Sequence, residues 1–379
     1  MRFMFFNEGN LGTHVVGHGQ LEKALRVGLQ EQGETEAHFE CLREMGRWPR
    51  AAAIRPLPAL AHAGLDPRTL RWHLVQSLRA RRALSRALAA WPADAAHVHT
   101  HTISFAMSRI MRELPIALSV DATVSDWAQM PAWHGIRKRF GPMGPSLALE
   151  RHTLAEAALV LAWTDWTRRG VQAQAANANV VELHPGIDLE RYRPAPRRER
   201  ALTRVLFVGG RFVEKGGEDL LAALEGELGH SVELDLVTPS ELPERPGVRT
   251  HRLGPNDPEL LDLQQQADVF CLPTLGDAVP WAVLEAMACG TPVLATDVGG
   301  IPDMLAHGRA GALVAPSNRA ALREALLGLI ASPQHRAELA GRAREHCESR
   351  YDARVQTGRL LTLMEEAVRA RSHTPGLVA

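Results

Sequence analysis

Several features that mark other classes of protein are missing from this chain of 379 residues. No apolar run approaches the roughly 18 residues that suggest a membrane span, and the opening M-R-F-M-F-F-N turns polar too early for a signal peptide. Its 43 basic and 43 acidic side chains give a formal net charge of zero, which argues against a dedicated nucleic-acid binder. We therefore expect a cytoplasmic protein with no nucleic-acid partner.

Patterns that would indicate a disulfide framework or a metal site are also scarce. The four cysteines, Cys41, Cys271, Cys289 and Cys347, show no C-x-x-C spacing, and the segments around Cys271 and Cys289 are typical of a core. Three histidines at positions 97, 99 and 101 alternate along an expected strand, which would point them to one face. That spacing would permit metal binding but does not favour it over a structural role. We expect reduced thiols, no metal site and no cofactor.

What the chain does contain is a repeated alternation of strands and helices. Its length exceeds what one core usually organises, so two domains are expected. Strands are predicted at 2–7, 37–41, 96–100, 115–120, 159–162 and 180–183, with helices between them, and a second series begins at Val205. This order predicts α/β architecture with doubly wound parallel sheets.

The segment from Gly276 to Thr296, G-D-A-V-P-W-A-V-L-E-A-M-A-C-G-T-P-V-L-A-T, places two acids eight residues apart around a helix start. Asp277 is expected in a loop, Pro280 at the first helical position and Glu285 one turn further. Such a loop follows a strand, where open α/β sheets bind ligands, and the helix start offers N–H groups to phosphate. Glu285 is too deep to cap the helix and is available to sugar hydroxyls. Alternatively, Asp277 caps the helix and Glu285 forms an ion pair.

About 70 residues upstream, the segment V-L-F-V-G-G-R-F-V-E-K-G-G places a loop with four glycines between a strand and a helix. Glycine lets the backbone approach a ligand, and the cations Arg211 and Lys215 can neutralise a diphosphate. The spacing fits neither a Walker A loop nor the dinucleotide-binding G-x-G-x-x-G. By itself, this loop is a weak indication of phosphate binding.

Together the two segments resemble the acid-x7-Glu and G-x-x-x-x-K-G motifs of retaining GT-B glycosyltransferases of family 4, the glycosyl transferases group 1. The junction H-P-G-I-D-L-E-R-Y-R-P resembles the family's crossover between domains. The resemblance implies two Rossmann-like doubly wound domains facing each other across a cleft. Residues 1–186 would bind the acceptor, residues 187–355 the nucleotide-sugar donor, and residues 356–379 would form a helix returning to the first domain.

The resemblance also implies roles for particular residues in the second half. Arg211 and Lys215 would hold the donor diphosphate and stabilise it as a leaving group, and Glu285 would bind the ribose. Sugar, phosphate and base would be contacted by Asp277, by the backbone of Gly210, Ala278 and Val279, and by Leu253 and Thr274. Many relatives read E-G-F-G where this chain has D-A-V-P, so Pro280 offers no N–H at a position where glycine is common.

In the first half the implied residues are fewer. Asp121, in L-S-V-D-A-T, ends an expected strand where many relatives have histidine, and it would orient an acceptor hydroxyl or stabilise positive charge on the sugar. Gly12 would let the first loop approach the donor or acceptor, although an ordinary β-α turn accounts for it equally well.

We therefore expect a metal-independent, retaining glycosyltransferase that moves a hexose-like unit from a UDP- or GDP-sugar to a hydroxyl acceptor of unknown type. Two-domain sugar-nucleotide epimerases, phosphorylases and non-catalytic nucleotide-sugar binders are the alternatives. The basic amphipathic segment 68–91 could rest weakly on anionic lipid at the inner membrane face, or it could be an ordinary domain helix. Whether its aromatic and leucine side chains face solvent distinguishes the two.

Overall fold

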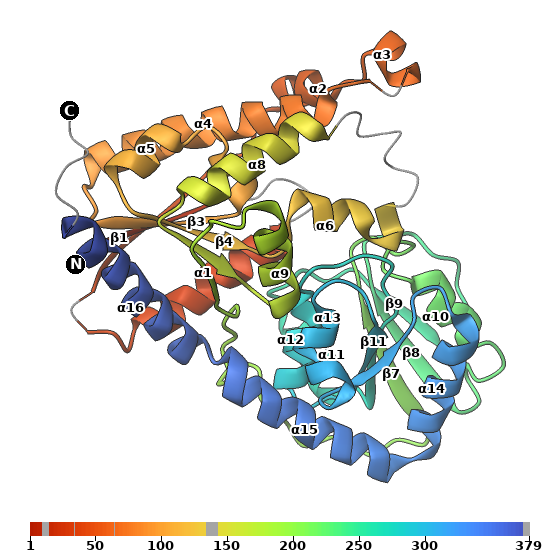
Figure 1. Ribbon diagram of the computed structural model, residues 1–379. Helices are drawn as coiled ribbons and strands as arrows, with labels where there is room; N and C mark the ends of the chain where they lie inside the picture. The colour runs from red at the N-terminus through yellow and green to blue at the C-terminus, as the bar shows by residue number, and fades with distance from the viewer. Residues whose placement is uncertain (10–14, 34, 64, 134–142, 374–379) are drawn as a thin grey trace. The chain divides into compact units, whose positions relative to one another are not determined.

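The computed structural model describes residues 1–9, 15–33, 35–63, 65–133 and 143–373. The chain divides into two compact units. Unit 1 comprises Met1–Gln129, Trp133–Gly186 and Arg354–Ala379, and unit 2 comprises Met130–Ala132 and Ile187–Ala353. Each unit is built on a six-stranded parallel sheet covered by helices (Figure 1), as the α/β prediction requires.

The sheet of unit 1 has the strand order β2-β1-β3-β4-β5-β6. Its strands are β1 (Arg2–Asn7), β2 (Glu36–Cys41), β3 (Ala95–His99), β4 (Ile116–Val120), β5 (Leu159–Ala162) and β6 (Val180–Glu182). Because β1 lies between β2 and β3, the direction of winding reverses there. This order is that of the flavodoxin-like doubly wound sheets, which bind ligands beyond the carboxyl ends of the strands at the reversal.

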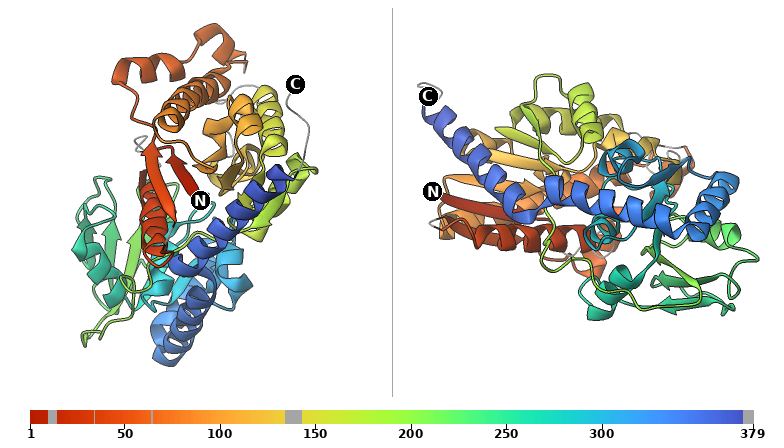
Figure 2. Two further views of the ribbon diagram at one scale, coloured as in Figure 1. Left: turned by 90° about the vertical axis from the view of Figure 1, so that its left-hand side faces the viewer. Right: turned by 90° about the horizontal axis from the view of Figure 1, so that it is seen from below.

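Helices cover both faces of this sheet, as Figures 1 and 2 show. They are α1 (Val15–Leu29), α2 (Arg47–Ile54), α3 (Pro58–His62), α4 (Arg68–Ala90), η1 (His101–Ser104), α5 (Ser108–Glu113), α6 (Val124–Gln129), α8 (Gly144–Glu156), α9 (Asp165–Gln174) and α16 (Ala353–Ser372). Alternate strand residues such as Phe6, Val98 and Leu118 pack with Leu84 of α4 and Leu154 of α8 in one buried cluster. The side chains between them face α1 and α16, because successive strand residues point to opposite faces.

The sheet of unit 2 has the order β12-β11-β10-β7-β8-β9. Its strands are β7 (Thr203–Val208), β8 (Val232–Val237), β9 (Val248–His251), β10 (Val269–Leu272), β11 (Val293–Thr296) and β12 (Ala312–Val314). Numbered from β7, this is the Rossmann order, in which the winding reverses between the first and fourth strands. Those strands are β7 and β10, which are direct neighbours.

Helices also cover both faces of the second sheet. They are α10 (Gly217–Ala223), α11 (Pro258–Gln266), α12 (Trp281–Ala288), α13 (Ile301–Met304), η3 (Ala306–Gly308), α14 (Arg319–Ala331) and α15 (Pro333–Tyr351), while η2 (Pro131–Trp133) begins in this unit. Figure 1 shows α10 and α14 on one side of the sheet and α11, α12 and α13 on the other. Asn318 caps α14 and Ser332 caps α15 through their side-chain oxygens.

Two local expectations require correction. Pro280 lies just before α12 with extended backbone rather than at its first helical position. His101 does not continue the alternation of β3, because the strand ends at His99 and His101 begins η1.

Cys271 and Cys289 are buried free thiols, as expected. Among the described helices, none combines the length and apolar character that crossing a membrane would need.

Candidate functional site

The two sequence motifs meet at the winding reversal of unit 2. The glycine-rich loop follows β7, and the loop containing Asp277 follows β10. The Leu275 amide donates to the Glu214 carbonyl at 2.8 Å, and the Thr274 hydroxyl donates to the same oxygen at 3.3 Å. These hydrogen bonds hold the two loops together at the sheet edge where this topology binds ligands.

An ion pair joins the two loops through their side chains. The Lys215 ammonium donates to a carboxylate oxygen of Asp277, and both side chains remain partly accessible, at 24% and 13%. The Lys215 amide donates to the Arg211 carbonyl at 2.8 Å, so one turn of loop carries both predicted cations. A cation and a carboxylate are therefore presented together at the reversal.

Two glycines fix the backbone around this pair. Gly216 has φ +78°, and a Cβ there would overlap the Pro273 carbonyl. Gly299 has φ +60°, and a Cβ there would overlap the Asp277 carbonyl. Only glycine adopts this conformation without cost. Gly299 is absent from the sequence-based list of site residues, although the pair of glycines shortly after β11 was an available signal.

Glu285 occupies a more enclosed position than its place in the helix suggested. Its side chain is buried in α12, with 3% of the residue exposed. The Tyr192 hydroxyl donates to one carboxylate oxygen at 3.2 Å, and the Gln264 amide donates to the other at 3.4 Å. The carboxylate is therefore already engaged by protein groups, and a ribose hydroxyl would have to share it with them. Tyr192 also lay outside the predicted site.

Most of the other predicted donor contacts lie in the loops after β7 and β10. Gly210 is exposed and Arg211 is half-buried in the loop after β7. Leu253 lies apart from these residues, half-buried in the loop after β9 at the edge of the sheet. The remaining predicted residues are buried: Thr274, Ala278 and Val279. Gly12 lies outside the described residues.

Unit 1 brings a different set of groups to its own reversal. The Glu8 amide donates to the His99 carbonyl at 2.9 Å, so the ends of β1 and β3 are adjacent. Asp121, at the end of β4, accepts from the Ala122 amide at 2.9 Å. Burial, and then the charge of Asp121, raise the pKa of Glu8 from 4.5 to about 7. Glu8 was missed as a candidate, although it directly follows a buried strand.

The three histidines near this edge have separate partners. His97 shares a hydrogen bond of 2.7 Å with Ser119, and burial lowers its pKa to about 4. His99 stacks on Trp163 with ring centroids 4.8 Å apart. His101 contacts a buried carboxylate oxygen of Glu150 at 2.6 Å. Nowhere in the described part of the chain do three His, Cys, Asp or Glu side chains gather as a metal ion would require.

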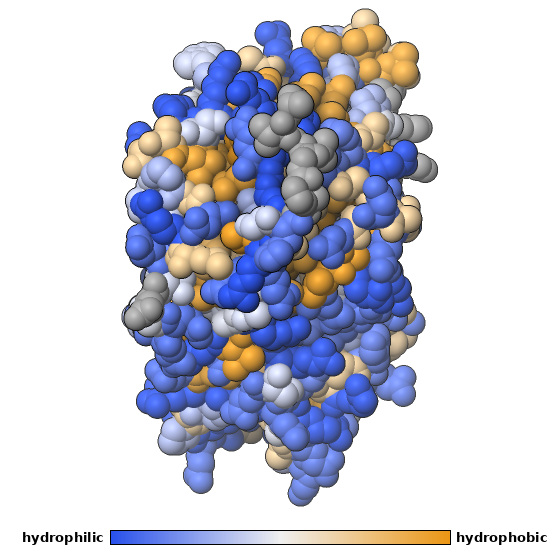
Figure 3. All heavy atoms as spheres, turned by 60° about the vertical axis from the view of Figure 1, so that its left-hand side comes forward, coloured by the Kyte–Doolittle hydropathy of each residue, from blue (hydrophilic) through white to orange (hydrophobic). Residues whose placement is uncertain are grey.

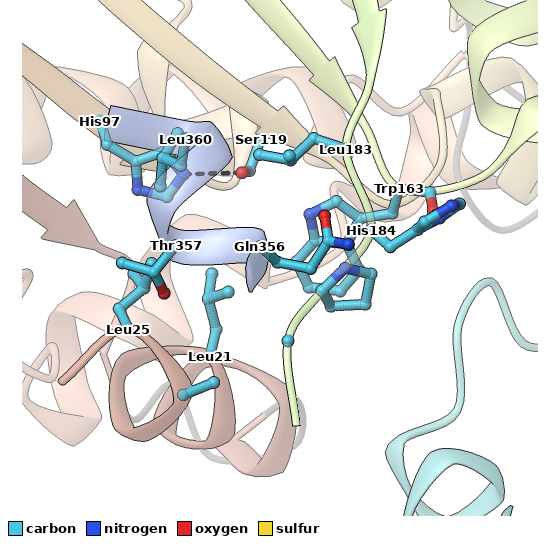
Figure 4. Close-up of a pocket in the computed structure, with 13 residues that line it drawn as sticks. Leu21, Leu25, His97, Ser119, Trp163, Leu183, His184, Gln356, Thr357 and Leu360 are labelled. Carbon is cyan, nitrogen blue, oxygen red and sulfur yellow. Dashed lines mark hydrogen bonds between the residues drawn. The ribbon is translucent and has the colours of Figure 1, made fainter. Parts of the chain in front are cut away.

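A small cavity lies within unit 1, between its sheet and the helices α1 and α16. Figure 4 shows His97 and Ser119 at one side of it and Gln356 beside His184 at the other. Leu21 of α1 and Leu360 of α16 also line it. Its volume of about 20 Å³ accommodates one water molecule but not a sugar nucleotide. It is therefore a packing feature beneath α16 rather than a substrate site.

Helix α4 is packed as an ordinary domain helix. Leu84 is fully buried, and Trp72 and Leu74 are half-buried. Arg68 and Arg71 both contact the buried carboxylate of Asp66. Of the large apolar side chains on this helix, Leu78 alone is classed as exposed. The side chains of α4 thus give little support to membrane contact through this helix itself.

Comparison with known proteins gives a family match within unit 2. Residues 203–332 match the family model described as glycosyl transferases group 1. This match supports, for the segment of unit 2 that it covers, the resemblance to glycosyl transferases group 1 recognised from the sequence. The matched segment contains the loops after both β7 and β10.

Curated relatives and solved structures extend this result. The chain is 33% identical over 199 residues to D-inositol 3-phosphate glycosyltransferase of Streptomyces bingchenggensis, covering 45% of this chain and 44% of the relative. It is 31% identical to phosphatidyl-myo-inositol mannosyltransferase of Mycolicibacterium smegmatis over 54% of this chain and 56% of the relative. The chain thus spans about half the length of the curated relatives it matches.

Two solved structures share the fold over almost the whole chain. Sucrose-phosphate synthase of Thermosynechococcus elongatus gives a TM-score of 0.75 at 18% identity, with 98% of this chain and 100% of that chain covered. HepE of Anabaena, solved with UDP, gives 0.67 at 15% identity, with 97% and 100% covered. The fold class is therefore that of the GT-B proteins, with two Rossmann-like sheets.

Proposed function

We propose that this protein transfers a sugar from a nucleotide diphosphate sugar to a hydroxyl acceptor, with retention of configuration at the anomeric carbon. The observation that carries the proposal is the pairing of Lys215 with Asp277 at the winding reversal of unit 2. These residues come from two motif loops, and both loops lie in the segment that matches glycosyl transferases group 1.

The ion pair suggests how a donor enters. The diphosphate would compete with Asp277 for the Lys215 ammonium, because two phosphates carry more charge than one carboxylate. Asp277 would then be released to accept hydrogen bonds from sugar hydroxyls. As the bond between the anomeric carbon and the diphosphate oxygen breaks, charge grows on the leaving group, and Lys215 and Arg211 would stabilise it. With two cations in this position, we propose that the reaction does not require a metal ion.

The acceptor hydroxyl would attack the anomeric carbon on the face from which the diphosphate leaves. A new bond forms between carbon and acceptor oxygen, and the hydroxyl proton passes to the departing phosphate oxygen. No side-chain base is needed in this scheme. Asp121 would orient the acceptor or stabilise positive charge on the sugar. The names of the two relatives, an inositol phosphate glycosyltransferase and a phosphatidylinositol mannosyltransferase, make inositol phosphate and phosphatidylinositol the first acceptors to test.

Calorimetry with UDP, GDP and ADP, followed by turnover with the corresponding sugar nucleotides, tests the proposal. We expect one nucleotide to bind. We also expect Lys215→Ala to lower turnover by about two to three orders of magnitude, the effect of losing one transition-state charge contact. Arg342→Ala, on the exposed surface of α15, is the matched control and should leave turnover unchanged.

The outcomes separate the alternatives. Equal turnover in wild type and Lys215→Ala would remove Lys215 from the site. Tight nucleotide binding without transfer to any acceptor would favour a non-catalytic binder. Loss of activity in excess chelator, restored by Mg²⁺ or Mn²⁺, would contradict the metal-free scheme.

A further inference from the structure

Exposed apolar side chains are concentrated in one short part of unit 1. Of the nine large hydrophobic residues classed as exposed in the described chain, six lie between positions 48 and 78: Trp48, Ile54, Leu57, Leu60, Leu65 and Leu78. Trp48 is the most exposed of all nine, at 83%. Single exposed apolar residues are normal, but a contiguous group of them indicates an interaction surface.

The local structure explains why these side chains are not buried. Helices α2 and α3 have eight and five residues, and Ala53 is the one residue that they bury. Figure 1 shows both helices on the outer side of α4, away from the sheet. The face drawn in Figure 3 shows hydrophobic residues gathered at its top. Because α2 and α3 bury so little in the core of unit 1, their exposed apolar side chains are available for contact with a partner.

The charges around these side chains are mainly of one sign. Arg43, Arg47, Arg50 and Arg55 lie in or beside α2, and Arg50 is half-buried while the others are exposed. Glu44 is the acid among them, and the next acid, Asp66, is buried against Arg68 and Arg71. Exposed aromatic and aliphatic groups interleaved with arginine complement a surface that is anionic outside and apolar beneath.

We propose that residues 43–63, together with Leu65 and Leu78, form a membrane-contact surface that binds anionic lipid bilayers. Trp48 and the leucines in and beside α3 (Leu57, Leu60 and Leu65) enter the boundary between headgroups and acyl chains, while the arginines of α2 contact lipid phosphates. The contact assigned here is made by α2 and α3, and α4 supports them from beneath through its packing against α2. This surface is independent of the nucleotide site, so its test does not depend on the proposed transfer reaction.

Co-sedimentation of the full chain with vesicles tests the inference. We expect binding to vesicles of phosphatidylcholine with 30% phosphatidylglycerol and none to pure phosphatidylcholine, with binding weakened by salt. Arg47→Glu should reduce the partition coefficient at least fivefold, the effect of about 1 kcal/mol for one arginine near an anionic surface. Trp48→Ser should reduce it by a similar factor.

Each variant has a matched control outside the surface. Val355→Ser removes an apolar side chain that is 54% exposed, and Arg342→Glu reverses an exposed charge on α15. Both controls should bind vesicles as wild type does. The inference is overturned if wild type does not bind anionic vesicles, or if controls and surface variants lose binding equally. It is also overturned if Trp48→Ser instead dissociates a dimer seen by sedimentation velocity, which would assign the surface to a second copy of the chain.

Discussion

The winding reversals of the two sheets differ in how backbone conformation and ionisable side chains contribute to them. In unit 2, backbone conformation defines the site, because Gly216 and Gly299 hold two loops in positions that a side chain would block. In unit 1 a single glycine of this kind follows β1, since Gly9 has φ +67° and a Cβ there would overlap the Leu42 carbonyl, and two acids, Glu8 and Asp121, lie at the ends of β1 and β4. A site made from backbone needs particular glycines at particular spacings, whereas a site made from side chains can vary with its ligand.

We expect the largest effect on the site in unit 2 from the substitution Gly299→Ala. The new Cβ would overlap the Asp277 carbonyl, and the residue would have to keep φ near +60°. We expect the free energy of unfolding to fall by about 1–3 kcal/mol. Turnover should fall by about tenfold or more, because displacing Asp277 misplaces its partner Lys215. Urea unfolding and initial rates measure the two effects.

Gly210→Ala is the control for this substitution. Gly210 lies in the same site, but a Cβ there would meet no atom within 4 Å, and its φ is not positive. Stability should therefore be unchanged. If Gly299→Ala were as stable and active as wild type, the backbone of unit 2 would not require glycine there, and the contrast between the two reversals would fail.

The same contrast explains how far the sequence could lead. Strands such as β1 and β5 were predicted at the bounds observed, because continuous apolar runs between polar turns are characteristic of buried parallel strands. The sequence assigned Lys215 to the diphosphate and Asp277 to the sugar, but it did not predict that the two side chains form an ion pair. Sequence could not show that Tyr192 engages Glu285 across 93 positions, because that contact depends on how the chain packs. The sequence also could not show that burial raises the pKa of Glu8, because burial depends on the packing of the fold.

A sharper comparison within unit 2 separates ligand binding from structure at Glu285. Tyr192→Phe removes the hydrogen bond from the tyrosine hydroxyl, so we expect a loss of about 1 kcal/mol in stability and unchanged nucleotide affinity. Glu285→Gln keeps the volume but removes the charge, so a ribose contact should weaken by about tenfold. Calorimetry on both variants distinguishes the roles. Equal nucleotide affinity in Glu285→Gln and wild type would make Glu285 a structural partner of Tyr192 and Gln264 only.

The smallest expected effect tests the acids at the reversal of unit 1 through their pH dependence. Burial and Asp121 raise the pKa of Glu8 to about 7, while Gln76 and His101 act in the opposite direction. The folded chain therefore binds this proton more tightly than the unfolded chain does. The stabilising contribution of Glu8 is complete below about pH 4.5 and is lost as pH rises through about 7.

Glu8→Gln should remove this pH dependence without removing the polar side chain. Because Glu8 is half-buried and water screens part of the cost, we expect wild type to lose about 1 kcal/mol relative to the variant between pH 4.5 and pH 8. His97, whose pKa is lowered to about 4, changes stability in the opposite sense, since stability is lost as pH falls below 6.5. That contribution is common to both proteins and cancels in the difference between their urea unfolding curves. Parallel stability profiles for wild type and Glu8→Gln would show that Glu8 titrates as an exposed acid and that burial and Asp121 do not raise its pKa.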